Sequence, residues 1–125
     1  DSTNPFHPDV VLLGKTLFFD TRISGDGATS CATCHRPEFA FSDQGKKISG
    51  NAASANGRNT PPLFNLAWQK SFFWDGGSTS LEAQALGPFQ HKNEMHLPIS
   101  KLIKKIQNIP EYTSQVHKIW GTTTI

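Results

Sequence analysis

The segment Cys31-Ala-Thr-Cys-His35 decides how this sequence is interpreted, because it places two thiols three residues apart and an imidazole directly after the second. This Cys-x-x-Cys-His pattern is the attachment signature of c-type haem. In such a site each thiol forms a thioether to the porphyrin edge, and the adjacent imidazole binds the iron. We therefore predict one covalent haem held by Cys31 and Cys34, with His35 as the proximal ligand.

Three other uses of the cysteine pair fit the sequence less well. A redox Cys-x-x-Cys motif follows a strand in a βαβ unit, but here SGDGATS at residues 24–30 precedes Cys31 and no alternating β-branched run lies nearby. A structural zinc site needs four ligands, and only His35 and distant histidines could complete two thiolates. A plain disulfide leaves His35 without a role.

Length and composition fit a single small domain over residues 1–125. Hydrophobic residues make up 36% of the chain and the formal net charge is +2, too little to argue for nucleic acid or an anionic membrane as partner. No stretch approaches the roughly 18 apolar residues of a membrane span. The N-terminal DSTNPFHP has neither the charge nor the apolar run of a signal peptide, so we expect Asp1 to be a cleavage product or an artificial boundary.

Helical periodicity is clearest at the two ends of the chain. In residues 8–19 and again in residues 110–120, a proline suits the first turn and apolar residues recur every three or four positions. Gly121 is placed to end the second of these helices. A glycine inside a helix is unfavourable by about 1 kcal/mol relative to alanine, so we expect Gly14 to mark the point where the two helices cross.

Two further helices are predicted between the ends. A capping box of Thr79 and Glu82 opens a helix over residues 80–86, which Gly87 and Pro88 end. The next helix begins at Pro98 and carries a buried stripe of isoleucine and leucine, with three lysines mostly outward: Lys101, Lys104 and Lys105. These lysines suit a solvated face better than a docking surface for an acidic redox partner.

Residues 20–62 are rich in Gly, Ser, Asn and Asp, which indicates mostly loop around a short helix at the haem motif. A chain with so much loop needs a large apolar object to fold around, and haem supplies one. The whole sequence therefore predicts an all-α, cytochrome c-like haem domain with long loops. Its expected haem neighbours are Phe39, Phe41, Leu63, Phe64, Phe72 and Phe73.

The order of several motifs resembles a known family. The motifs are LGKTLFFDTRISGDGATSCATCH (13–35), GRNTPPLFNLAW (57–68), FFWDGG (72–77), LEAQALGP (81–88) and NEM (93–95). Together they are similar to the N-terminal haem domain of bacterial di-haem cytochrome c peroxidases and MauG-like enzymes. In that family this haem reacts with peroxide, and a C-terminal domain, absent from this sequence, carries a second haem that relays electrons.

The resemblance implies roles for four residues. Trp74 corresponds to the tryptophan between the two haems, Gln84 to a distal-pocket glutamine and Glu94 to the distal acid. Asn59 matches a position near an inter-domain calcium ion. From the residues alone, Glu94 and Gln84 are better explained as a surface carboxylate and a solvated helix residue, and only the resemblance reverses that order. Trp74 fits a buried aromatic wedge equally well.

The sequence also departs from the family pattern. Members that need reductive activation carry a histidine after the haem motif that caps the iron, and residues 36–60 contain none. Gly77 stands where an arginine usually follows the Trp-Asp-Gly element, which changes the ion pairing expected there. The missing histidine favours an open sixth position on the iron.

These observations lead to one main functional hypothesis. Cleavage of peroxide needs an open iron position, a base for the first proton and an acid to return it. The Glu94 carboxylate can serve as both, and the Gln84 amide can orient peroxide without adding charge. We expect a peroxidase-type domain that reduces hydrogen peroxide with electrons from a donor protein or a second haem domain, with Trp74 as the conduit.

The alternative hypothesis is a small electron-transfer cytochrome c with a six-coordinate haem. Met95, His91 and His96 lie together downstream, and any of them could close the sixth position; His/Met ligation would raise the potential. A haem sensor or binding module is a third class. Covalent haem is attached outside the bacterial cytoplasm, so all three imply a periplasmic protein.

Covalent attachment through Cys31 and Cys34 gives the first testable prediction. After denaturation, the intact mass should exceed that of the polypeptide by one haem, because thioether bonds survive unfolding. Intact-protein mass spectrometry makes the measurement. Haem that is extracted by acid-acetone would contradict the prediction.

Overall fold

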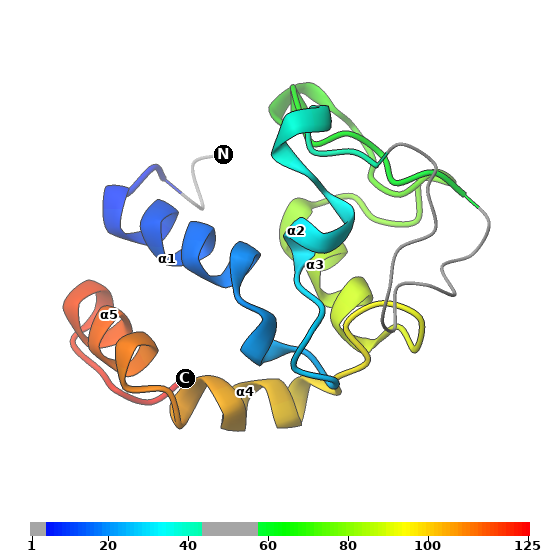
Figure 1. Cartoon of the computed structure of the whole chain (residues 1–125). Helices are drawn as coiled ribbons and strands as arrows, with labels where there is room; N and C mark the ends of the chain where they lie inside the picture. The colour runs from blue at the N-terminus through cyan, green and yellow to red at the C-terminus, as the bar shows by residue number, and fades with distance from the viewer. Residues whose placement is uncertain (1–4, 44–57) are drawn as a thin grey trace.

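The computed structural model describes residues 5–43 and 58–125, and within them the chain is helical (Figure 1). The α-helices are α1 (Pro8–Phe19), α2 (Cys31–Cys34), α3 (Leu81–Gln90), α4 (Ile99–Gln107) and α5 (Pro110–Trp120). Short 3₁₀ turns are η1 (Thr21–Ile23), η2 (Pro37–Phe39) and η4 (Leu66–Trp68). The described residues form only isolated β-bridges and no strand, so the all-α prediction is confirmed.

The core lies where α1, α4 and α5 meet (Figure 1). Both terminal helices have the predicted bounds, and Gly121 ends α5 with a φ of 72°. An ion pair of 2.6 Å between Lys118 and Asp9 joins their outer sides. The buried residues of the core are Leu13, Ile23, Met95, Leu97, Leu102, Tyr112 and Val116.

The role predicted for Gly14 is wrong. A Cβ atom built at Gly14 would meet nothing within 4 Å, so the helices do not approach each other there. The neighbouring Leu13 is buried in the core with Tyr112 and Val116. Successive residues of an α-helix are rotated by about 100° around its axis. Position 14 therefore points away from the contact that Leu13 makes.

Helix α3 begins and ends later than the sequence predicts. Its N-cap is Ser80, whose Oγ accepts a hydrogen bond from the Ala83 N–H at 3.1 Å, so the predicted cap, Thr79, and the predicted start at residue 80 are each one residue too early. The helix then continues through Gly87 and Pro88 to Gln90 instead of stopping before them.

Contacts from outside α3 explain why its last turn persists. The carbonyls of Pro88 and Phe89 accept hydrogen bonds from the N–H groups of Met95 and Leu97 at 3.1 and 2.7 Å. These bonds satisfy acceptors that a helix end otherwise leaves open. The Phe73 ring packs so closely on Gly87 that a side chain at 87 would collide with it, so this glycine serves packing and does not terminate the helix.

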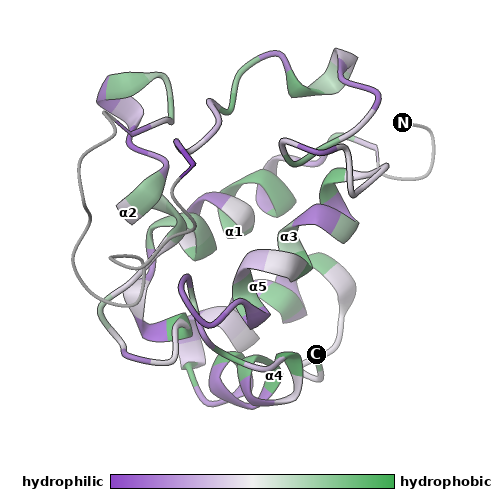
Figure 2. Cartoon of the chain, turned by 90° about the vertical axis from the view of Figure 1, so that its right-hand side faces the viewer, coloured by the Kyte–Doolittle hydropathy of each residue, from purple (hydrophilic) through white to green (hydrophobic). Residues whose placement is uncertain are grey.

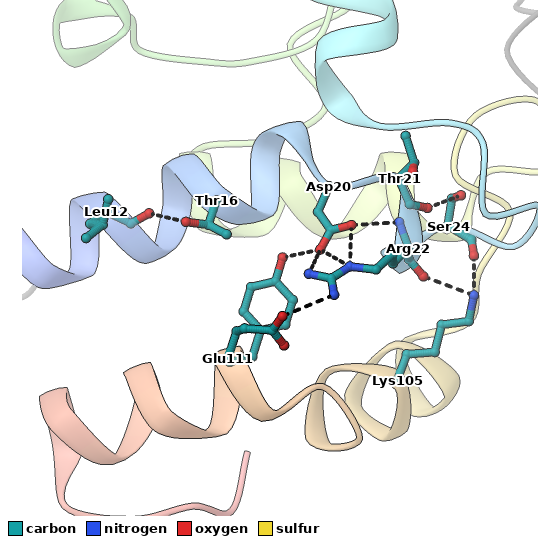
Figure 3. A network of polar contacts seen from close by, with 9 residues as sticks. Leu12, Thr16, Asp20, Thr21, Arg22, Ser24, Lys105 and Glu111 are labelled. Carbon is teal, nitrogen blue, oxygen red and sulfur yellow. Dashed lines mark hydrogen bonds and ion pairs between the residues drawn. The ribbon is translucent and has the colours of Figure 1, made fainter.

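Asp20 links the end of α1 to α5 (Figure 3). Its carboxylate accepts hydrogen bonds from the Arg22 N–H at 2.8 Å and from the hydroxyl of the fully buried Tyr112 at 2.6 Å. The Arg22 guanidinium binds the same carboxylate at 2.9 Å and reaches Glu111 at 3.6 Å. Burial alone would raise the pKa of Asp20, but the bonds from Arg22 and Tyr112 outweigh it and lower the pKa.

One of the three lysines predicted to point outward has a different role. Lys101 and Lys104 are exposed on α4, whose residues alternate between hydrophilic and hydrophobic (Figure 2). Lys105 is only half-exposed, and its Nζ donates to the carbonyls of Ser24 at 2.5 Å and Arg22 at 3.2 Å (Figure 3). Its long stem brings the ammonium to the loop that precedes α2.

Tyr112→Phe should lower the free energy of unfolding by about 1.5–3 kcal/mol at neutral pH, because Asp20 loses a hydrogen bond to a charged acceptor. The Asp20 pKa is lowered in the folded protein. Its stabilising contribution is therefore present above the unfolded pKa and lost as the pH falls through the folded pKa. Urea unfolding of the haem-loaded protein should show a difference that shrinks in acid.

Glu111→Gln is the control for this experiment. Its contact with Arg22 is 3.6 Å long and exposed, so the free energy of unfolding should change by less than about 0.5 kcal/mol. Equal urea midpoints for wild type and Tyr112→Phe would mean that the Tyr112 hydroxyl does not hold α1 to α5.

Candidate functional site

The cysteine pair lies on α2, a helix of a single turn. Its start is fixed by Ser30, whose N–H donates to the Thr33 Oγ1 at 2.9 Å. Its end is fixed by the His35 N–H, which donates to the Cys31 carbonyl at 2.9 Å. Residues three apart lie on one side of a helix, so both free, half-buried thiols can reach one flat ligand.

The loop before α2 is built around Asp26. One carboxylate oxygen accepts from the Ser24 hydroxyl at 2.8 Å and from the N–H groups of Ala28 and Thr29 at 3.0 Å. The other accepts from the Thr29 hydroxyl at 2.9 Å. Burial raises the pKa of Asp26, but these bonds together outweigh it and hold the pKa far below its usual range. A charged Asp26 therefore fixes the approach to the first cysteine.

The same loop contacts the segment that carries Glu94. The Gly25 N–H donates to the Met95 carbonyl at 2.7 Å. A Cβ at Gly25 would collide with the carbonyl of His96, so only glycine permits this approach. Residues separated by some seventy positions in the chain are thereby held side by side around α2.

His35 is oriented by the backbone. Its Nδ1 lies 2.8 Å from the Phe41 carbonyl oxygen, and because a carbonyl can only accept, Nδ1 carries the proton. The other nitrogen, Nε2, is then the one left to bind a metal. The carbonyl is aimed at the ring by two successive left-handed residues, Ala40 and Phe41, with φ of 55° and 57°.

The surroundings keep the His35 imidazole neutral. Burial lowers its pKa, although hydrogen bonds to the Phe41 and Pro61 carbonyls and the charge of Asp43 act in the opposite direction. The Phe18 ring from α1 lies 6.4 Å from the imidazole and 5.9 Å from the Phe41 ring, between centroids. Neutral imidazole is the form that ligates metals.

A strap of residues 60–63 is hydrogen-bonded to the loop that contains His35 and Phe41. Asp43 accepts from the Thr60 N–H at 3.0 Å and from its hydroxyl at 2.6 Å. The Ser42 hydroxyl donates to the Thr60 carbonyl, and the Leu63 N–H donates to the Ala40 carbonyl at 3.3 Å. The turn that orients His35 is thus held from both sides.

Trp74 and Asn59 meet on the surface beside this strap. The Trp74 indole N–H donates to the Asn59 carbonyl at 2.8 Å, and 59% of the Trp74 residue is exposed. Arg58 pairs with Asp75 at 2.6 Å, so Asp75 has a cationic partner although Gly77 replaces the usual arginine. A shallow pocket of about 380 Å³ is lined by Arg58, Asn59, Trp74 and Asp75.

Glu94 lies within electrostatic reach of the haem motif. Burial raises the pKa of its carboxyl, and the nearby His91 reduces that rise. Burial and then the negative charge of Glu94 raise the pKa of the Cys34 thiol to about 11. The pKa of Cys31 is raised mainly by burial, with a further rise from Glu94. The negative charge of Glu94 therefore acts on both cysteines.

The other candidates differ in burial and in local conformation. Gln84 is half-buried on α3, two turns before His91. Met95 is 3% exposed and packs in the hydrophobic core. His96 is exposed and adopts a left-handed conformation with φ of 49°. Of the expected haem neighbours, Phe72 is buried, while Phe64 and Phe73 are 54% and 47% exposed; their contact with haem stays a prediction.

The residues fit haem better than a bare metal ion. Across residues 5–43 and 58–125, no group of three or more His, Cys, Asp or Glu is placed to hold a metal, so a zinc site lacks ligands. The half-buried free thiols, the single-turn helix and the imidazole held through Nδ1 suit covalent haem. No helix within these residues is long and apolar enough to span a membrane.

Fold and site together define a cytochrome c-like haem domain. Residues 8–125 match the family model described as di-haem cytochrome c peroxidase, and the chain belongs to this family. The methylamine utilization protein MauG of Methylorubrum extorquens is 40% identical over 119 residues, covering 95% of this chain and 34% of that protein. The cytochrome c551 peroxidase of Pseudomonas aeruginosa is 37% identical over 106 residues, covering 85% and 31%.

Solved structures share the fold. The crystal structure of a MauG-like protein associated with microbial copper homeostasis superposes with a TM-score of 0.82 at 27% identity, covering 97% of this chain and 36% of that one. The diheme peroxidase BthA from Burkholderia thailandensis superposes with a TM-score of 0.75 at 26% identity, covering 98% and 36%. The chain spans about a third of the length of these relatives.

Sequence reasoning missed two contributors to the His35 environment. Phe18 was not among the expected haem neighbours, although Leu-Phe-Phe at the end of a predicted helix is a signal for an aromatic contact. The Phe41 carbonyl leaves no trace in the sequence, because every residue has a carbonyl and only the local φ values direct this one.

His35→Ala should leave the thioether bonds intact but change both the ferric and the ferrous absorption spectra, because the proximal imidazole is lost. Spectra of the oxidised and reduced haem-loaded variant make the measurement. His117→Ala, an exposed position on α5, is the matched control and should leave both spectra as in wild type. Unaltered spectra for His35→Ala would assign the proximal position to another residue.

Proposed function

We propose that this chain is the peroxide-reacting haem domain of its family and reduces hydrogen peroxide at an iron whose sixth position is open. The observation that carries the proposal is the half-buried Glu94, whose charge acts on both attachment cysteines. A carboxylate beside the haem motif is what proton transfer to and from peroxide requires. Family membership over residues 8–125 supports the same conclusion.

One set of residues would hold the haem, and another set would act on peroxide. When bound, haem supplies the iron that accepts peroxide and exchanges electrons with it. Cys31 and Cys34 would anchor the porphyrin edge, and His35 would hold the iron through Nε2 while its Nδ1 stays on the Phe41 carbonyl. This hydrogen bond fixes the ring plane and raises the basicity of the ligand.

Glu94 would move the protons. Peroxide reduction consumes two protons and two electrons and yields two water molecules: H₂O₂ + 2 H⁺ + 2 e⁻ → 2 H₂O. Glu94 takes the proton from one peroxide oxygen and returns it to the other, which then departs as water. The Gln84 amide, with a donor and an acceptor, would orient peroxide without adding charge.

The electrons would come from a donor protein or from a second haem domain. Trp74 suits a conduit because its exposed ring is fixed by the bond to Asn59. The family also suggests calcium near Asn59. Calcium takes about six to eight oxygen ligands, and Asp75, the carboxylate that lines one pocket with Asn59, already pairs with Arg58, so such a site would need further oxygens from elsewhere. A periplasmic location follows from covalent haem attachment.

The electron-transfer alternative needs a sixth ligand from Met95, His91 or His96. Met95 packs in the hydrophobic core, and His96 is exposed in a left-handed turn. Both observations favour an open sixth position. A ferric haem with an open position binds cyanide readily. Slow or absent cyanide binding that Met95→Ala restores would favour the carrier.

Glu94→Gln should slow the reaction with peroxide by about 10²–10⁴-fold, because the general acid–base group is lost. Burial raises the pKa of Glu94, so the carboxylate needed for the first proton is lost as the pH falls through this raised value. The wild-type rate should therefore decline at a higher pH than an exposed glutamate would give. Stopped-flow rates against pH measure both effects.

Glu82→Gln, an exposed position in the first turn of α3, is the matched control and should keep the wild-type rate and pH profile. A wild-type rate for Glu94→Gln would remove Glu94 from the mechanism. Steady turnover should remain slow unless an electron donor or a second haem domain is supplied, because each peroxide needs two electrons.

A further inference from the structure

His91 faces Glu94 across a short side-chain contact. Its Nδ1 lies 3.3 Å from the Glu94 Oε1. The turn that joins them is fixed by the His91 carbonyl, which accepts from the N–H groups of Glu94 at 3.0 Å and His96 at 3.2 Å. His91 is also the C-cap of α3, where its own N–H donates to the Gly87 carbonyl at 3.1 Å. The pair is therefore held by backbone bonds on both sides.

The two edges of the His91 ring have different surroundings. The Nδ1 atom is buried, while 36% of the side chain is exposed, so the exposed part of the side chain is not the atom that meets Glu94. A contact of 3.3 Å is longer than the roughly 2.7–2.9 Å of a charge-assisted hydrogen bond. Catalytic hydrogen bonds often tighten only once substrate is bound.

We propose that His91 passes protons between solvent and Glu94, acting through Glu94 and without contact to the iron. The inference rests on the proposed function. Imidazole can take a proton at one nitrogen and release one from the other, and it does so near neutral pH. This assignment replaces the idea that His91 closes the sixth position of the haem.

The proton balance shows where such a path is needed. Glu94 can shift peroxide's own proton from one oxygen to the other without help. The two protons that complete two waters must come from solvent, alongside two electrons from the donor. Glu94 is only 35% exposed, so each proton delivered through the half-exposed His91 restores the carboxyl group for the next step.

Other titratable groups near the pair do not offer the same path. The thiols of Cys31 and Cys34 feel the charge of Glu94, but they cease to titrate once they are thioethers. Lys92 is exposed between the two residues, and its single ammonium nitrogen has no second nitrogen through which to pass a proton on. Among the described residues, His91 thus offers the ring with two nitrogens that contacts Glu94 and is partly exposed.

The test uses His91→Asn on the haem-loaded protein, which keeps an N–H donor near the Nδ1 position but cannot carry a proton across a ring. The peroxide reaction should slow about tenfold, as expected for a partner that acts through another group. Cyanide association should slow similarly, because hydrogen cyanide must lose its proton on binding. Carbon monoxide, which carries no proton, should bind the reduced protein at the wild-type rate.

Two further measurements separate proton transfer from a structural effect. Rising phosphate buffer should restore the rate of His91→Asn but not alter wild type, since phosphate can carry protons to Glu94. The double variant His91→Asn/Glu94→Gln should react no more slowly than Glu94→Gln alone, because His91 acts only through Glu94. His117→Asn on α5 is the control and should match wild type; His91→Gln repeats the test if the asparagine variant folds poorly.

Wild-type peroxide and cyanide rates in both His91 variants would overturn the inference while leaving the function of Glu94 intact. Equal slowing of carbon monoxide binding, or additive losses in the double variant, would also overturn it. If instead Glu94→Gln itself reacts at the wild-type rate, the proposed function fails and the inference fails with it. Cyanide binding that appears only after His91 is replaced would make His91 an iron ligand.

Discussion

The hydrogen bond between the His35 Nδ1 and the Phe41 carbonyl is the contact on which the rest of the site depends. It fixes the tautomer and the plane of the imidazole, and so decides which nitrogen faces a metal. The carbonyl points inward only because Ala40 and Phe41 are both left-handed, a conformation unfavourable for residues with a Cβ. The strap held by Asp43 and Thr60 stabilises that turn from outside.

A second set of contacts brings the helical core to this turn. Asp20 ends α1, and its bonds to Arg22 and Tyr112 fix that end against α5. Phe18, two residues earlier, is thereby placed beside the His35 ring. The loop built on Asp26 then leads directly into α2. Because Asp20 and the haem motif are close in sequence, the contacts that fix Asp20 to the core also restrain the position of the site.

The sequence predicted the features that have local causes. The bounds of α1 and α5 were correct because proline at the first turn, helical periodicity and a glycine after the last residue all act within one segment. The end of α3 and the role of Gly14 were wrong because distant partners decide them: Phe73 packs on Gly87, and Leu13 makes the helix contact. Lys105 likewise finds its carbonyl partners across the fold. Cys31, Cys34 and His35 could be singled out from the sequence because their chemistry is in the side chains, and their roles as haem attachment and ligand stay predictions.

Burial affects the two sides of the candidate site in complementary ways. It lowers the pKa of His35, which keeps the imidazole neutral and able to bind a metal. It raises the pKa of Glu94, which moves the carboxyl toward the pH at which a group can both accept and return a proton. Disfavouring charge on both residues thus prepares one as a ligand and the other as an acid–base group. The same loss of water around Glu94 creates the need for a proton path, and the partly exposed His91 is the residue positioned to provide it.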